Sequence, residues 1–198
     1  MLSNPLPATC RTYSTHRTDT ASYPADWQTH QLVKMGQPHG DQILGIDSPD
    51  DPTLLTSDGC LTSQPGLHLQ VKTADCLPIL LYHPKPVIGA IHAGRKSTQQ
   101  QILSKVCQLL QEKFAIFDQL ALWFGPAICV DCYQVDREMD LHYNLIAENT
   151  KQLRQFFSKE QATIFNSDLC TAHHNDQFFS YRQEGPQVPR NFSGIVLE

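Results

Sequence analysis

The sequence of 198 residues has no long apolar run, no cluster of basic residues and no low-complexity tract. Because a membrane-spanning helix needs about 20 mostly apolar residues, none is expected. The 15 Lys and Arg are fewer than the 20 Asp and Glu and are scattered, which excludes the basic footprint of a nucleic-acid-binding protein. The first residues also lack a charged segment followed by an apolar core, so a cytoplasmic protein is predicted.

The sequence also lacks a disulfide pattern. Its seven cysteines are odd in number and irregularly spaced, which argues against a covalent framework in a reducing compartment. Cys10, Cys60, Cys107 and Cys170 are therefore interpreted as small buried apolar residues.

Apolar periodicity predicts a mixture of strands and helices without strict alternation. Short runs bounded by turn residues predict strands at 11–15, 32–35, 67–72, 77–82, 87–91, 120–124, 163–165, 178–181 and 195–197. Apolar residues at helical spacing predict helices at 97–114 and 138–157. The sequence therefore predicts an α+β fold with a mixed β-sheet covered by helices.

The chain is expected to form one domain over residues 1–198, since this length suffices for a single core. Residues 1–30 have weak periodicity, and at most one short strand is expected there. Ser97, followed by Gln100, is typical of a reciprocal cap at a helix start.

Cys76 and His92 flank the two most apolar runs of the chain. The runs at 77–82 and 87–91 are separated by a Pro-containing turn, which predicts an antiparallel hairpin. Such a hairpin brings the start of its first strand beside the end of its second, so Cys76 and His92 are expected to share one site.

His39 lies in a Pro-His-Gly turn and is the third candidate for this site. Two imidazoles and one thiolate suit zinc, and three protein ligands leave a fourth position free, as in catalytic zinc sites. Asp75 precedes Cys76 and can move a proton, orient a ligand or cap a loop. From the residues alone, two alternatives stay open: unrelated structural side chains, or Cys76 and His92 as a nucleophile and its base.

Cys129 and Cys132 form a CxxC pair that resembles part of a zinc deaminase signature. That signature requires Pro directly before the first Cys together with an HxE sequence, and both are missing. The pair is therefore interpreted as mainly structural. His173 and His174 are assigned to a polar loop, and His142 to the second helix.

The order of motifs resembles the YfiH family, formerly called laccase-domain or polyphenol oxidase proteins. The motifs are QPHG, SDGCLT, KTADCLPILL, AIHAG, GPAICVDCYQV, DLCT and FFSYR, spread over residues 32–182. The resemblance implies that His39, Cys76 and His92 bind zinc. It also implies a fold similar to that of certain toxin deamidases with a Cys and His pair.

The resemblance further implies phosphorolysis of purine nucleosides, namely adenosine, inosine and methylthioadenosine, together with adenosine deamination. Asp75, Cys76 and His92 are then the expected catalytic residues. The small-molecule partners would be a nucleoside and phosphate. Because guanidinium groups grip phosphate oxygens in pairs, Arg182 is the first candidate to hold phosphate, followed by Lys96 and Arg95.

The chain departs from the family pattern in three places. The usual HAGWRG is replaced by HAGRKS, the usual CCYEV appears as DCYQV at 131–135 and loses a carboxylate at Gln134, and the N-terminal segment over residues 1–30 is shortened. These departures keep two alternatives open: a peptidoglycan-precursor editing factor or non-catalytic relative, and a Cys/His hydrolase or deamidase. Copper is disfavoured as the metal, because one thiolate and two imidazoles cannot assemble several copper centres.

Overall fold

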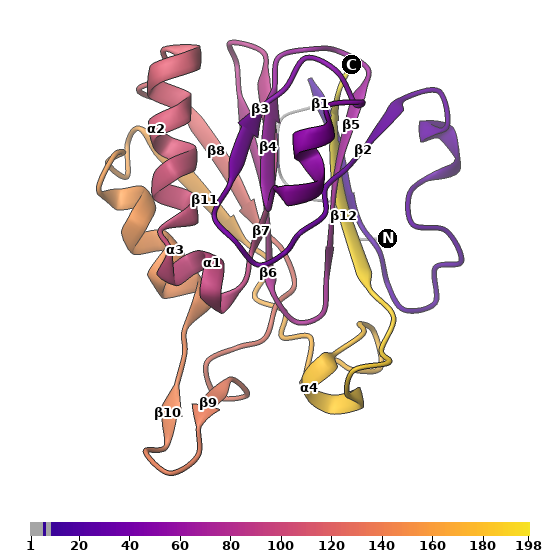
Figure 1. Cartoon of the computed structure of the whole chain (residues 1–198), viewed down its shortest axis with the longest axis vertical. Coiled ribbons are helices and arrows are strands. Elements are labelled where there is room, and N and C mark those ends of the chain that lie inside the picture. Colours follow the sequence, from indigo (N-terminus) through magenta and orange to yellow (C-terminus); the bar gives the residue numbers. More distant parts are fainter. Residues whose placement is uncertain (1–5, 7–8) are drawn as a thin grey trace.

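The computed structural model describes residue 6 and residues 9–198, so residues 1–5 and 7–8 of the predicted N-terminal segment lie outside the described part (Figure 1). The strands of the larger sheet are β3 (Ile43–Gly45), β4 (Gly59–Thr62), β6 (Leu77–His83), β7 (Val87–Ala93), β8 (Leu120–Phe124) and β11 (Ala162–Asn166). Those of the smaller sheet are β1 (Cys10–Ser14), β2 (Gln31–Lys34), β5 (Leu67–Thr73) and β12 (Asn191–Leu197).

The remaining elements are helices, 3-10 turns and a hairpin. The helices are α1 (Arg95–Gln99), α2 (Ile102–Phe114), α3 (Leu145–Arg154) and α4 (Tyr181–Glu184). The 3-10 turns are η1 (Ala25–Trp27) and η2 (Pro52–Thr56), and the hairpin pairs β9 (Gln134–Asp136) with β10 (Leu141–His142).

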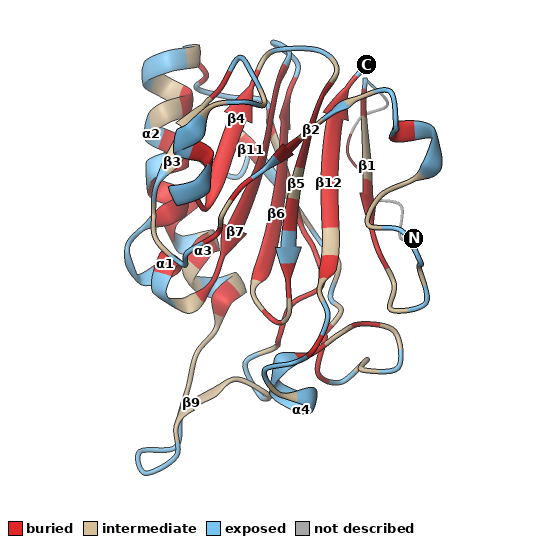
Figure 2. Cartoon of the chain, turned by 45° about the vertical axis from the view of Figure 1, so that its right-hand side comes forward, coloured by how far each residue is buried: buried red, intermediate tan, exposed pale blue. Residues whose placement is uncertain are grey.

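The six-stranded sheet has the order β11-β8-β6-β7-β4-β3 and the four-stranded sheet the order β1-β12-β5-β2. Both sheets contain parallel and antiparallel pairs. The larger sheet is covered by α2 and α3 on one face and by the smaller sheet on the other, as Figures 1 and 2 show. The predicted α+β class with a mixed sheet is therefore confirmed, and a second sheet takes part in the covering.

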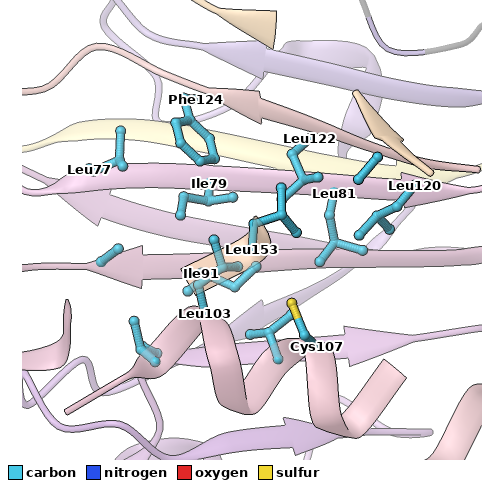
Figure 3. Close-up of a cluster of buried hydrophobic side chains, with 14 of the residues drawn as sticks. Leu77, Ile79, Leu81, Ile91, Leu103, Cys107, Leu120, Leu122, Phe124 and Leu153 are labelled. Atoms are coloured by element: carbon cyan, nitrogen blue, oxygen red, sulfur yellow. The ribbon is translucent and has the colours of Figure 1, made fainter. Parts of the chain in front are cut away.

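The central strands are apolar throughout because both of their faces are buried. Leu77, Ile79 and Leu81 of β6 point toward the helices, where they pack in one cluster with Leu103 and other side chains (Figure 3). The intervening residues Leu80 and Tyr82 pack in a second cluster, between the sheets. This layering fixes the register of β6 and β7, since a slip by one residue would exchange their two faces.

The predicted helix at 97–114 is divided into α1 and α2. Gln101 adopts a left-handed conformation with φ of 65°, which interrupts the helix between them. The backbone N–H groups of Leu103 and Ser104 donate to the side-chain oxygen of Gln152 from α3, which caps α2. The predicted cap at Ser97 is wrong: Gly94 is the N-cap and Ser97 is buried within α1.

Two other predictions are corrected. The helix expected at 138–157 begins only at Leu145, because Asn144 caps it by accepting a hydrogen bond from Ala147 N at 2.9 Å. His142 consequently lies in β10. The strand expected at 178–181 does not form, and Tyr181 instead begins α4. In the described part of the chain, each helix is too short or too polar to cross a lipid bilayer.

Candidate active site

The candidate site lies at one end of the larger sheet, where β6 begins and β7 ends. Cys76 immediately precedes β6, and His92 is the penultimate residue of β7. The antiparallel register pairs Leu77 with Ala93, so Cys76 lies beside the chain that follows His92. His39 comes from the loop after β2. The prediction that β6 and β7 form an antiparallel hairpin, with Cys76 and His92 adjacent, is confirmed.

The ligand atoms of His39, Cys76 and His92 all lie within 4.8 Å of one another. The two imidazole rings are nearly perpendicular, with centroids 4.8 Å apart. Gly94 packs directly against the cluster, since a Cβ atom there would lie 3.0 Å from the Cys76 sulfur and 3.1 Å from the His39 ring. The sequence AIHAG thus supplies both a donor, His92, and, at Gly94, the space that the neighbouring donors need.

Charge coupling favours the ionised form of this cluster. Partial burial alone raises the pKa of Cys76, but the imidazoles of His92 and His39 outweigh it and the pKa falls below its ordinary value. Burial alone lowers the pKa of His92, while the Cys76 thiolate and Asp58 raise it above its ordinary value. One thiolate and two neutral imidazoles are donors that suit zinc, and three of them leave one coordination position free.

Asp58 organises the cluster and was not recognised from the sequence. This carboxylate is fully buried, and one oxygen lies 2.7 Å from His92 Nδ1. It also accepts hydrogen bonds from the backbone N–H groups of His39 at 3.0 Å and Gly40 at 2.7 Å. One side chain thus orients one imidazole directly, leaving its Nε2 for a ligand, and fixes the loop that carries the other.

The signal for Asp58 in the sequence was weak, because Asp followed by Gly59 is also typical of a turn. In the structure, β4 begins at Gly59, directly after Asp58. Since β4 pairs with β7, this position faces the end of β7 that carries His92.

The loop that carries His39 is fixed to both neighbouring segments. The Gln37 side chain donates a hydrogen bond to the carbonyl of Lys72 at 2.8 Å and accepts one from the N–H of Lys72 at 3.0 Å. It thus pairs with β5 in the way that the backbone of a neighbouring strand does. Gly36 passes so close to η2 that a Cβ atom would lie 1.8 Å from the carbonyl oxygen of Leu55. A side chain at residue 36 is therefore incompatible with the observed path of the loop.

We expect Gly36→Ala to destabilise the protein by about 3 kcal/mol, because backbone atoms must move to relieve the overlap. The matched control is Gly40→Ala in the same loop, where the nearest atom would lie 3.5 Å from the new Cβ. Urea unfolding of both variants measures the difference. Equal midpoints for the two variants would contradict this account of the loop.

Asp75 joins three segments beside the cluster. One oxygen accepts a hydrogen bond from the Thr171 hydroxyl at 2.7 Å, and the other accepts from Arg182 N at 2.8 Å. The Asp75 carbonyl accepts from Ile128 N at 3.0 Å. Of the roles expected for Asp75, these contacts favour the capping and positioning role, since they hold the segments that follow β8 and β11 and the start of α4.

A cavity of about 980 Å³ opens beside the cluster. Its cationic lining residues are Lys72, Arg95, Lys96, Arg182 and Arg190. Among the described residues that line it, Asp75 is the only acid. All three phosphate-binding candidates from the sequence therefore face the same cavity as the cluster.

The aromatic and apolar part of the cavity comes from elsewhere in the chain. Tyr133 and Tyr181 line it together with Ile128 and Leu145. The guanidinium carbon of Arg182 lies 5.7 Å from the Tyr133 ring centroid, and Arg182 also donates to the carbonyl of Gln134 at 2.8 Å. The cavity therefore offers a flat apolar wall next to positive charge.

The structure contains a second group of potential metal ligands, which the sequence analysis did not connect with one another. Cys129 and Cys132 converge with Cys170 and His173, and their ligand atoms lie within 4.8 Å of one another. The sequence contained the signal, because the CxxC pair is followed by Cys170-x-x-His173, a second pair at the same spacing.

The fold and the site define an α+β domain in which a Cys/His/His cluster opens into a cationic cavity. The chain belongs to the family whose model is described as multi-copper polyphenol oxidoreductase laccase, which matches residues 15–161 and 139–198. The structure of the hypothetical protein YfiH of Bacillus licheniformis is similar, with a TM-score of 0.76, 26% identity and coverage of 86% of this chain and 76% of that one. The resemblance to the YfiH family is thereby confirmed.

Named relatives extend the comparison. A purine nucleoside phosphorylase of Clostridium acetobutylicum is 30% identical over 189 residues, covering 86% of this chain and 79% of that protein. One from Streptomyces griseus is 36% identical over 111 residues, which is 54% of this chain but 45% of that protein. YlmD of Geobacillus stearothermophilus shares the fold, with a TM-score of 0.82 at 21% identity over 96% of this chain and 93% of that one.

Proposed function

We propose that this protein is a zinc-dependent purine nucleoside phosphorylase that also deaminates adenosine. The observation that carries the proposal is the single cavity that joins the cluster of His39, Cys76 and His92 to five cationic side chains. In a chain with a formal charge of −5, this concentration of positive charge is suited to an anionic substrate such as phosphate. Relatives named purine nucleoside phosphorylase support the nucleoside as its partner.

His39, Cys76 and His92 would hold the zinc ion, with Asp58 orienting His92 behind it. When bound, zinc with one free position polarises a substrate atom or brings the pKa of a bound water to about 7. Asp58 keeps the ring of His92 in one orientation and tautomer. The absence of a side chain at Gly94 leaves room for the Cys76 sulfur and the His39 ring.

The cationic residues would bind and orient phosphate. Arg182 leads, because its planar fork has five N–H donors and, within the described part of the chain, its guanidinium group donates one hydrogen bond, to the carbonyl of Gln134. Lys96 and Arg95 follow directly after the Gly94 that packs on the cluster, so they extend the positive charge toward it.

The apolar wall would bind the purine. Tyr133 presents an aromatic face next to Arg182, and Ile128 and Leu145 exclude water from the same side. In phosphorolysis a phosphate oxygen bonds to ribose C1′ as the bond from C1′ to the purine nitrogen breaks. The purine leaves with that electron pair and takes up a proton, giving the free base and ribose 1-phosphate. In deamination water replaces the amino group of adenosine, and ammonia leaves.

Inosine tests the first activity. Purified protein with about one or more zinc ions per chain should release hypoxanthine from inosine only when phosphate is present, and ribose 1-phosphate should form in equal amount. Zinc without any turnover would instead support a non-catalytic relative or a peptidoglycan-precursor editing factor. Oxygen consumption with a phenol would support the copper oxidase that the family description names.

Arg182→Ala should raise the KM for phosphate by about 10- to 100-fold, because it removes a charge-assisted contact. The KM for inosine should change much less. Lys159→Ala is the matched control, since Lys159 is exposed and does not line the cavity. Steady-state kinetics with either substrate varied measure both constants, and a phosphate KM equal to that of the control would remove Arg182 from the phosphate site.

A second candidate function rests on the contact between His92 and Asp58. With Cys76 beside His92, the 2.7 Å contact from His92 Nδ1 to Asp58 completes a thiolate, imidazole and carboxylate series of the kind used by cysteine hydrolases and deamidases. A zinc chelator separates the two candidates. Amide hydrolysis that survives the chelator and stops on alkylation of Cys76 would favour the hydrolase.

A further inference from the structure

Four side chains outside the candidate active site form a compact group of thiols and an imidazole. Cys129 and Cys132 lie between β8 and β9, and Cys170 and His173 follow β11. The Cys129 sulfur lies 3.6 Å from His173 Nδ1, and the Cys132 sulfur lies 3.2 Å from His173 Nε2. None of the four is among the described residues that line the cavity, so the proposed nucleoside chemistry does not use them.

The spacing of these residues is that of two short metal-binding turns. Each pair, Cys129 with Cys132 and Cys170 with His173, has two residues between its members, which lets both donors of one tight turn face the same point. Three thiols and one imidazole make a complete tetrahedral set for zinc, with no position left for a substrate. That is the composition of structural zinc sites.

The backbone around Cys170 is arranged to stabilise negative charge on its sulfur. The N–H of Cys129 donates to the Cys170 sulfur at 3.3 Å, and the N–H of His173 donates to it at 3.5 Å. Hydrogen bonds of this kind favour a thiolate over a thiol, and the thiolate is the form that binds metal. These two hydrogen bonds are an observation separate from the spacing of the four residues along the sequence.

We infer that Cys129, Cys132, Cys170 and His173 form a second metal site, which binds one zinc ion in a closed structural role. Ligand atoms around tetrahedral zinc lie about 3.6 to 3.8 Å apart, close to the observed sulfur–nitrogen distances. His173 is exposed, and its two ring nitrogens face two different sulfurs. Rotation of the exposed side chain would place one of these nitrogens on the metal.

The site would brace the wall of the cavity. The two ligand-bearing segments already meet at a parallel bridge between Ala127 and Cys170. Between them they carry Ile128 and Tyr133, which line the cavity, and Thr171, which binds Asp75. A zinc ion joining both segments would therefore fix the positions of cavity residues without touching the substrate.

The test uses a chain in which the first cluster is disabled, so that its outcome does not depend on the proposed function. Cys76→Ser protein, purified without chelator, should retain about one zinc ion per chain. Its cobalt-substituted form should show the strong thiolate-to-cobalt charge-transfer absorption expected of several sulfur ligands. Adding Cys129→Ser and Cys132→Ser should abolish both the zinc and the absorption band.

His173→Ala and His174→Ala, each in the Cys76→Ser background, form the matched pair. His173 is exposed, so its loss should leave the fold intact while lowering zinc affinity at least about 10-fold, as measured by competition with a chromogenic chelator. His174, the next residue, is outside the group and its replacement should leave the affinity unchanged. Equal affinities in the pair, a metal-free Cys76→Ser protein in the presence of excess zinc, or a disulfide between Cys129 and Cys132 under those conditions would overturn the inference.

Discussion

Cys76→Ser is expected to lower kcat/KM for inosine phosphorolysis by more than about 100-fold, because a hydroxyl group is a far poorer zinc ligand than a thiolate. The residue is central to its cluster, since both imidazoles act on its sulfur and lower the pKa of the thiol. The loss should appear in kcat as well as in kcat/KM if the cluster acts on the reacting atoms.

Cys107→Ala is the matched control for that substitution. Cys107 is buried in α2 against the larger sheet and belongs to neither cluster, so its loss should reduce stability slightly and leave kcat unchanged. Full phosphorolysis by folded Cys76→Ser protein, with near-wild-type thermal unfolding, would show that the cluster is not the catalytic centre.

The second large effect is expected from Asp58→Asn, which should lower zinc affinity at the first cluster and kcat by about 10- to 100-fold. The amide has nearly the shape of the carboxylate, but one oxygen is replaced by a donor. That donor faces His92 Nδ1 or the backbone N–H groups of His39 and Gly40, all of which bind the carboxylate in the wild type. Either way one buried contact becomes unfavourable and the imidazole loses its fixed orientation.

Asp41→Asn controls for the loss of an acid near the same loop, since Asp41 forms a surface ion pair with Lys105 and contacts neither His39 nor His92. Zinc titration and the kinetics of inosine phosphorolysis at several pH values measure the effect of both variants. A role confined to folding would lower the unfolding midpoint of Asp58→Asn and leave the zinc affinity and kcat of the folded fraction unchanged.

The strands β6, β7 and β8 of the larger sheet could be predicted because both of their faces are buried, whereas β3 and β4 of the same sheet were missed. Complete burial leaves short, uninterrupted apolar runs bounded by Pro, Gly or Asp, and such runs have few other interpretations. The strand at Leu120–Phe124 was predicted with its observed bounds. The meeting of Cys76 and His92 followed from the same local signal, since a hairpin needs only neighbouring segments.

Elements held by distant contacts could not be predicted in this way. The aromatic run at 178–181 is typical of a strand, yet Tyr181 begins α4 because Asp75, more than a hundred residues earlier, accepts the hydrogen bond of Arg182 N near the start of that helix. The break between α1 and α2 likewise depends on Gln152 of α3, whose side chain binds the first turn of α2.

The sequence by itself therefore determined the central strands β6, β7 and β8, the family, and the three donors His39, Cys76 and His92 as candidates. It could do so because apolar periodicity and short motifs are local properties. Only the tertiary structure decided that Asp58 supports two of those donors, that five cations share their cavity, and that Cys129, Cys132, Cys170 and His173 converge. The order of strands in a sheet decides which loops meet at its edge, and local residue preferences do not contain that order.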